Sequence, residues 1–176
     1  ISDKAANMMV EYLGTNLEKI NNELGKLYIN HPKEKVINEV VIETYIGISK
    51  DYNIFEFQKA LAKKNVVKAN QIANHFALNP NENPIFKTIS MVFSFFSKVI
   101  LIHSLTDKSE SAIMSKAKLT PYTKQDYIDA SRNYSSKKAL EIIGWLRECN
   151  VRAIGIDNNT ADQGELLREL VFKIMH

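Results

Sequence analysis

Glycine is absent from the long middle of the sequence, and this absence constrains the fold more than any other feature. None of the six glycines lies between Gly47 and Gly144, and only Pro80, Pro84 and Pro121 interrupt that stretch. Because glycine and proline are the residues that most often end helices, their scarcity favours helices of ordinary length. No segment shows sustained alternation of apolar and polar residues, so the sequence predicts an all-α chain.

Capping residues and apolar spacings of three and four predict where the helices lie. Ser2, Thr15, Thr123 and Ser135 each precede a helical pattern, and Thr15 and Thr123 have an acidic residue three positions on, as in a capping box. Gly14 is expected to end the first helix. Beyond a third helix that begins near residue 36 and ends near Gly47, we expect helices over 53–63, 66–78, 83–105, 109–118, 123–133, 135–149 and 163–175.

The segment 85–105 is the most apolar of these helical patterns. Its phenylalanines, isoleucines and valines cover more than one face of a helix, which indicates a helix surrounded by others. Buried packing is the simpler explanation, and a ligand pocket lined by this segment is the alternative. The polar residues within it argue against a membrane span.

Several classes of site are unsupported by the sequence. Cys149 is the only cysteine, so the chain has no internal disulfide, and we expect a reducing, cytoplasmic setting. No phosphate-binding loop of the P-loop kind is present, and the four histidines have no partner at metal-ligand spacing. Asp126 with Asp129 is expected to form a solvated pair, and Cys149 at a helix end is a poor nucleophile. We therefore expect no catalytic residue, no metal and no cofactor.

Charge is distributed unevenly along the chain. Residues 1–48 carry 5 basic and 7 acidic side chains, a net charge of −2, whereas residues 49–176 carry 18 and 13, a net charge of +5. The polar stretch near residue 49 predicts a domain boundary, which gives domains 1–48 and 49–176. The basic excess leaves open an independent helical nucleic-acid-binding module as an alternative function. Its basic residues are Lys59, Lys63, Lys64, Lys68, Lys116, Lys118, Lys124, Arg132, Lys137 and Lys138.

Three segments, in order, carry a resemblance to a known family. The string from Tyr12 to Leu27 resembles the pattern G-x-[DN]-L-x-x-[IL]-x-N-E-[LI]-x-K-L of the delta subunit of the bacterial DNA polymerase III clamp loader. Residues 53–61, beginning Asn-Ile-Phe-Glu-Phe, look like the start of the last domain of that family, and 68–69 and 83–85 fit the helices that follow. Residues 164–174 are similar to the closing helix of delta chains from the Bacteroidetes lineage.

The resemblance implies a fold, a function and partners. In this family an AAA+ ATPase-like domain is followed by a helical lid and a helical collar that oligomerises with other loader subunits. Residues 1–48 would be later helices of the lid and 49–176 the collar, with the clamp-gripping N-terminal domain not included. The implied partners are the gamma/tau and delta prime subunits, with the sliding clamp bound only through that N-terminal domain, DNA contacted indirectly or weakly, and no membrane.

One position within the resemblance bears on catalysis. Relatives that hydrolyse ATP carry G-[ST]-x-R at the corresponding lid helix, and its arginine senses the terminal phosphate of the nucleotide. Here Gly14, Thr15 and Asn16 are followed by Leu17, which carries no charge. The resemblance therefore implies a subunit that does not hydrolyse ATP and is not itself an enzyme, although it belongs to a DNA polymerase (nucleotidyltransferase) holoenzyme.

Collar function requires a surface for partner subunits. Aromatic residues and arginine are enriched at the energetic centres of protein interfaces. Tyr134, Trp145, Arg147 and Arg152 are therefore the candidate partner-interface residues, while core packing for Trp145 and solvated surface for the arginines remain the alternatives.

Overall fold

The structure of the chain, a computed structural model, is built from α-helices. It describes residues 1–13, 17–30, 36–46, 52–156 and 161–176, with backbone only for Glu11 and Tyr12. These residues contain no strand, and the prediction of an all-α chain is confirmed for them. The helices are α1 (Asp3–Leu13), α2 (Leu17–Asn30), α3 (Glu39–Ile46), α4 (Ile54–Ala62), α5 (Val66–Leu78), α6 (Ile85–Ser104), α7 (Glu110–Ala117), α8 (Lys124–Asn133), α9 (Ser136–Ala153) and α10 (Gln163–Met175).

The contacts of the chain form two compact units, Ile1–Phe55 and Glu56–His176, and the boundary between them along the chain falls within the first turn of α4. The first unit is small, and α1, α2 and α3 share one core of Ala5, Met9, Leu27 and Ile42. Its apolar residues follow the helical spacing of the sequence, so each short helix buries one stripe and exposes the rest.

The first unit also shows how its helices begin. Ser2 caps α1, because its hydroxyl accepts a hydrogen bond from the backbone N–H of Ala5 at 3.2 Å. The α3 helix is shorter than predicted, since it begins at Glu39. Before it, the carbonyl oxygen of Ile37 accepts a hydrogen bond from the backbone N–H of Ser2 at 2.8 Å. The predicted roles of Gly14, Thr15 and Gly47 lie outside the described residues.

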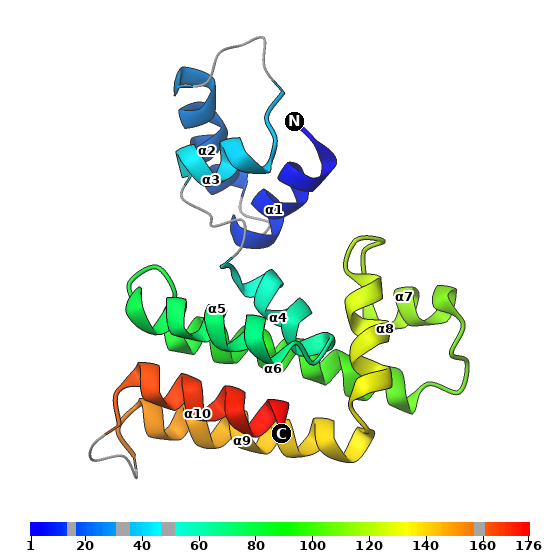
Figure 1. Ribbon diagram of the computed structural model, residues 1–176. Helices are drawn as coiled ribbons and strands as arrows, with labels where there is room; N and C mark the ends of the chain where they lie inside the picture. Colours follow the sequence, from blue (N-terminus) through cyan, green and yellow to red (C-terminus); the bar gives the residue numbers. More distant parts are fainter. Residues whose placement is uncertain (14–16, 31–35, 47–51, 157–160) are drawn as a thin grey trace. The chain divides into compact units, whose positions relative to one another are not determined.

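Helix α6 is the central helix of the second unit (Figure 1). Eight of its 20 residues are buried, among them Val92, Phe95, Phe96 and Val99. It packs mainly against α9 and α8, and Phe95 lies against Tyr127 of α8 with ring centroids 4.6 Å apart. By length and composition α6 is also the one described helix that could cross a membrane. Its buried residues give it the position of a core helix, as the sequence predicted.

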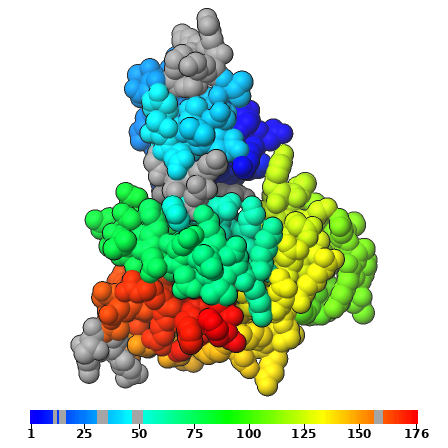
Figure 2. Space-filling view, in the orientation of Figure 1, coloured from blue at the N-terminus to red at the C-terminus, as the bar shows by residue number. Residues whose placement is uncertain are grey.

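Helix α10 closes the second unit by packing against both α5 and α9. Figure 2 shows α5 in green and α10 in red side by side on one face of this unit. Where they meet, Gly164 lies so close to Ala77 that an added Cβ would fall 2.7 Å from the Ala77 Cβ. A glycine at this position therefore allows the two backbones to approach.

Most helix boundaries of the second unit agree with the prediction to within two residues. Two of the N-caps differ from the prediction. Ser135 caps α9 as expected, by accepting from the Lys138 N–H at 3.1 Å. Thr123 precedes α8 but makes no side-chain cap bond, because its hydroxyl faces Thr120 instead. Asp162 and Glu165 form a full capping box on α10 that the sequence reading did not identify.

Candidate partner interface

The four candidate interface residues lie on or next to α9, in three different environments. Tyr134, just before the helix, is only 1% exposed. Trp145 and Arg152 are partly buried on the side of α9 that meets α10, and Arg147 is exposed on its outer side. The structure therefore does not bring the four candidates together on one surface.

Tyr134 is a core residue, which corrects its choice as a surface residue. Its hydroxyl donates a hydrogen bond to the carbonyl oxygen of Leu61 at 2.7 Å, and its ring lies edge-on to Phe96 with centroids 5.2 Å apart. Burial raises the pKa of this phenol, so the donor remains protonated. Its side chain holds α4, α6 and the start of α9 together and leaves almost no surface for a partner.

Trp145 lies at the edge of the contact between α9 and α10. The ammonium group of Lys138, two turns earlier on α9, is 4.5 Å from the centroid of its rings, a cation–π geometry. The same ammonium group donates to the carbonyl oxygen of Lys173 on α10 at 3.4 Å. Lys138 therefore joins the end of α10 to the ring of Trp145.

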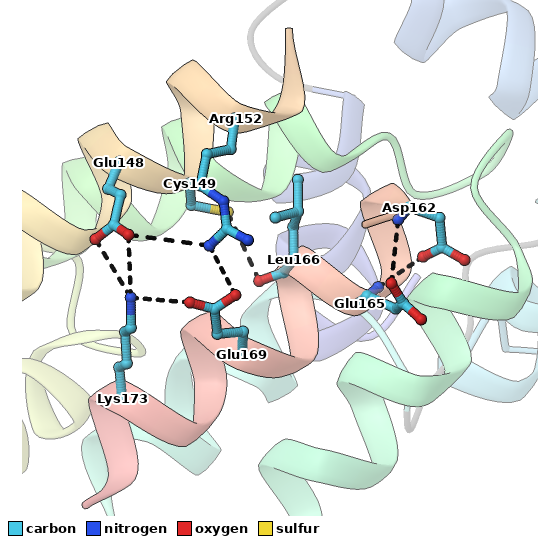
Figure 3. Close-up of polar contacts among 8 residues, drawn as sticks. All are labelled: Glu148, Cys149, Arg152, Asp162, Glu165, Leu166, Glu169 and Lys173. Carbon is cyan, nitrogen blue, oxygen red and sulfur yellow. Dashed lines mark hydrogen bonds and ion pairs between the residues drawn. The ribbon is translucent and has the colours of Figure 1, made fainter. Parts of the chain in front are cut away.

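Four charged side chains form an ion-pair network beside Trp145 (Figure 3). Arg152 donates to Glu169 at 2.7 Å, and Lys173 lies 2.9 Å from the same carboxylate. Glu148 closes the network, 3.3 Å from Lys173 and 3.9 Å from Arg152. Two cations and two anions alternate across α9 and α10, so the network carries no net charge.

The network shifts the pKa values of Arg152, Glu169 and Lys173 in the directions that favour their charged forms. Lys173 and then Arg152 lower the pKa of Glu169, and Glu169 raises the pKa of both cations. Glu148 and Glu169 are each more than a third exposed, so solvent screening keeps each of these ion pairs weak. The network mainly fixes how α9 and α10 align.

Cys149 lies beneath this network and is buried. Burial, and then the carboxylate of Glu169, raise the pKa of its thiol to about 11. Its Sγ–H points to the carbonyl oxygen of Leu166, 3.8 Å away. A thiol in this state is a weak nucleophile, which agrees with the expectation from its place near a helix end.

A shallow pocket lies over the same contact. None of its lining residues comes from the segment 85–105, so it does not support the ligand-binding alternative built on that segment. The lining residues are Trp145, Glu148, Cys149, Arg152, Leu166, Glu169, Leu170 and Lys173. The sequence reading missed Glu148, Glu169 and Lys173, although Glu148 with Arg152 and Glu169 with Lys173 have the i, i+4 spacing of helix ion pairs.

The remaining candidate chemistry is sparse. No group of three or more metal-ligating side chains occurs among the described residues. Asp126, which was expected to be solvated, is partly buried. This burial raises the pKa of its carboxyl group, although the nearby Lys59 and Lys63 act in the opposite direction. These two lysines therefore lie near Asp126.

The basic residues of the second unit do not form one uninterrupted positive surface. Lys124 lies 2.6 Å from Glu110 of α7, and Lys59 lies 3.6 Å from Glu56 on its own helix. Lys138 is engaged with Trp145 and α10. Charges that are partly paired in this way attract a phosphate backbone less strongly than their number suggests.

The chain was compared with known proteins by sequence and by structure. No family model and no curated protein sequence matches it. A solved structure of a Bacillus subtilis DNA clamp loader delta protein (YqeN) matches with a TM-score of 0.66 and 21% sequence identity. The match covers 99% of this chain and 50% of that protein, so the chain spans about half of its length. This likeness shows that the chain has a clamp-loader-like fold.

Proposed function

We propose that this chain is part of the delta subunit of a bacterial DNA polymerase III clamp loader. The observation that carries the proposal is the structural likeness to a clamp loader delta protein, which extends over 99% of the chain. The motifs in residues 12–27, 53–61 and 164–174 support it independently, because they are features of the amino-acid sequence and do not depend on the structural likeness.

In this proposal the chain acts by association and not by catalysis. Residues 1–48 form later helices of the lid, and residues 49–176 form the collar that joins the gamma/tau and delta prime subunits in the cytoplasm. The proposal assigns no ATP hydrolysis to the chain, since Leu17 stands where motor subunits carry an arginine that senses phosphate. The α9–α10 surface, with Trp145 and Arg152, is one candidate contact with a neighbouring subunit.

The proposal is tested by reconstitution. The chain is mixed at micromolar concentration with purified gamma/tau and delta prime subunits of the same organism and separated by size. Co-elution in a complex of defined stoichiometry is the expected result. Separate elution of the chain, with gamma/tau and delta prime still associating with each other, would contradict the proposal.

The nucleic-acid-binding alternative makes a different prediction. It requires affinity for primed or single-stranded DNA that falls steeply with salt, because bound lysines release counterions from the phosphates. Fluorescence anisotropy with a labelled oligonucleotide at about 50 mM and 200 mM salt measures this. Binding by the isolated chain with that salt dependence, without association with loader subunits, would favour the alternative.

A further inference from the structure

Within the second unit, α6 exposes an apolar stripe, and α9 exposes a stripe of apolar residues with one glycine and one arginine. On α6 the stripe consists of Phe86, Ser90, Phe93, Ser97 and Leu101, whose spacings of three and four place them on one face of the helix. Phe86, Phe93 and Leu101 are 41%, 48% and 38% exposed. Neither an acidic nor a basic residue lies within this stripe, and the serines leave the two aromatic rings standing above the helix surface.

On α9 the stripe consists of Leu140, Gly144, Arg147 and Val151, with the same helical spacing. Leu140 is 57% exposed. The opposite side of α9 is occupied, since Trp145 and Arg152 face α10 and Ala139 and Leu146 are buried. The stripe is thus the outer face of the helix.

The two stripes belong to neighbouring helices that run in opposite directions (Figure 1). The end of α6 meets the start of α9, where the Nε2 atom of His103 lies 2.8 Å from the carbonyl oxygen of Tyr134. At about 100° per residue, the α6 stripe lies roughly a third of a turn beyond Phe96, which packs on Tyr134 at the start of α9. The α9 stripe lies a similar angle, in the same rotational sense, beyond the buried Ala139 and Leu146. For antiparallel helices this places both stripes on one side of the pair. We call this surface the α6–α9 face.

Gly144 is the unusual residue of the α6–α9 face. Glycine inside a helix costs roughly 0.5–1 kcal/mol relative to alanine. Apart from the adjacent residues and backbone of α9 itself, no described atom of the second unit lies within 4 Å of the position that a Cβ at Gly144 would take, so packing within this unit does not require glycine here. The axes of two packed helices usually lie about 8–10 Å apart, and the distance depends on the side chains at the contact. Because glycine has no side chain, a glycine at an exposed helix crossing permits a second helix to come closer than this.

Arg147 is the only charged residue of the α6–α9 face, and it makes no ion pair within the described part of the chain. A surface with one unpaired cation among exposed apolar side chains is complementary to an apolar surface with one anion. The α6 helix has 20 residues, so it is about 30 Å long and offers room for an interface of standard size.

From these observations we infer that the α6–α9 face binds an amphipathic helix of a neighbouring subunit, packed over Gly144 with a carboxylate against Arg147. The inference rests on the proposed function, since the partner is another subunit of the clamp loader. It differs from the candidate residues read from the sequence, because only Arg147 of those four belongs to this face.

The test uses reconstitution with purified gamma/tau and delta prime subunits, followed by a titration that measures the affinity of the chain for them. The variants are Gly144→Ala, Gly144→Leu and Phe93→Asp on the face. Phe172→Asp on α10 is the matched control, because Phe172 is 61% exposed and lies outside the face. We expect each face variant to weaken assembly by about tenfold or more and the control by less than about twofold.

A series at Arg147 tests the charge of the partner. We expect Arg147→Lys to retain most of the affinity, Arg147→Gln to lose part of it and Arg147→Glu to lose the most, because like charges then meet. Arg168→Glu, an exposed arginine of α10, is the control. Equal loss with Gln and Glu would exclude a carboxylate partner.

The outcomes separate this inference from the proposed function. If the wild-type chain assembles and the face variants assemble equally well, the inference is wrong and the proposed function stands. If the wild-type chain does not assemble, both are wrong. Should Phe93→Asp fail to fold, Gly144→Ala still decides, since this change is expected to stabilise the helix while it weakens assembly.

Discussion

The hydroxyl group of Tyr134 donates a hydrogen bond to the carbonyl oxygen of Leu61, 73 positions earlier in the chain, at 2.7 Å. The same carbonyl also accepts from the backbone N–H of Lys64 at 3.0 Å, where α4 ends. The tyrosine therefore satisfies one of the last carbonyl groups of α4 from inside the core.

Replacing Tyr134 with phenylalanine tests the contribution of this hydrogen bond. We expect Tyr134→Phe to lower the free energy of unfolding by about 1 kcal/mol, because the ring packing remains and Lys64 still donates to the carbonyl. Tyr134→Ala should cost about 3–5 kcal/mol by leaving a cavity beside Phe96. Urea unfolding measures both, and Tyr122→Phe, at an exposed tyrosine, should leave stability unchanged. Equal effects of Tyr134→Phe and Tyr122→Phe would contradict this account.

Two glycines should respond to alanine in opposite directions. Gly144→Ala is expected to raise the free energy of unfolding by roughly 0.5–1 kcal/mol, since open space surrounds the new methyl group. Gly164→Ala is expected to lower it by about 1–3 kcal/mol, because the methyl group would meet Ala77. Thermal and urea unfolding of the two variants provide the comparison. A shift of the same sign in both would show that the contact with Ala77 is not decisive.

Cys149 should be protected from alkylation in the folded chain. Burial raises the pKa of its thiol to about 11, two units above 9.0, so about 100-fold less thiolate is present at pH 8. We expect the rate of reaction with iodoacetamide to be lower by at least that factor than in urea. Mass spectrometry measures it without ambiguity, because the chain has a single cysteine. Rapid alkylation of the folded chain would mean that Cys149 is accessible.

The ion-pair network predicts an acid-dependent loss of stability. The pKa of Glu169 is lowered in the folded chain, so its stabilising effect is present above the unfolded value of about 4.3 and is lost as pH falls through the lower folded value. Between about pH 5 and pH 3, the free energy of unfolding of wild type should therefore fall more than that of Glu169→Gln. The difference between the two should be less than about 1 kcal/mol, because the carboxylate of Glu169 is 39% exposed.

The control for this acid effect is Glu141→Gln, at an exposed position of α9 with no ion pair within the described residues. Its loss of stability over the same pH range should match that of wild type. Parallel pH profiles of wild type and Glu169→Gln would show that the network does not contribute.

The helices could be predicted from the sequence because their signals are local. The dense apolar pattern of residues 85–105 predicted a central helix, and α6 occupies that position with eight buried residues. Ser135 is a good N-cap by residue type, and it caps α9. Such signals depend on neighbours within one or two turns, which a sequence displays directly.

Features that depend on distant parts of the chain were predicted less well. The helix predicted over 135–149 is too short, because α9 continues to Ala153 and Arg152 in its last turn is held by Glu169 of α10. Tyr134 is a candidate partner-interface residue by its residue type, whereas in the structure it bonds Leu61 and packs on Phe96 in the core. Their positions are set by tertiary packing, which overrides the local pattern.

The position of α10 affects how the chain folds while it is being made. The apolar faces of α5 and α9 pack against α10, which supplies Leu166, Leu167, Leu170 and Val171. Residue 163 is synthesised 85 residues after residue 78, because 163 − 78 = 85, which takes about 4–17 s at ~5–20 residues per second. During that time the side of α5 that packs against α10 is uncovered, so the nascent second unit exposes apolar surface that chaperones can bind until α10 emerges.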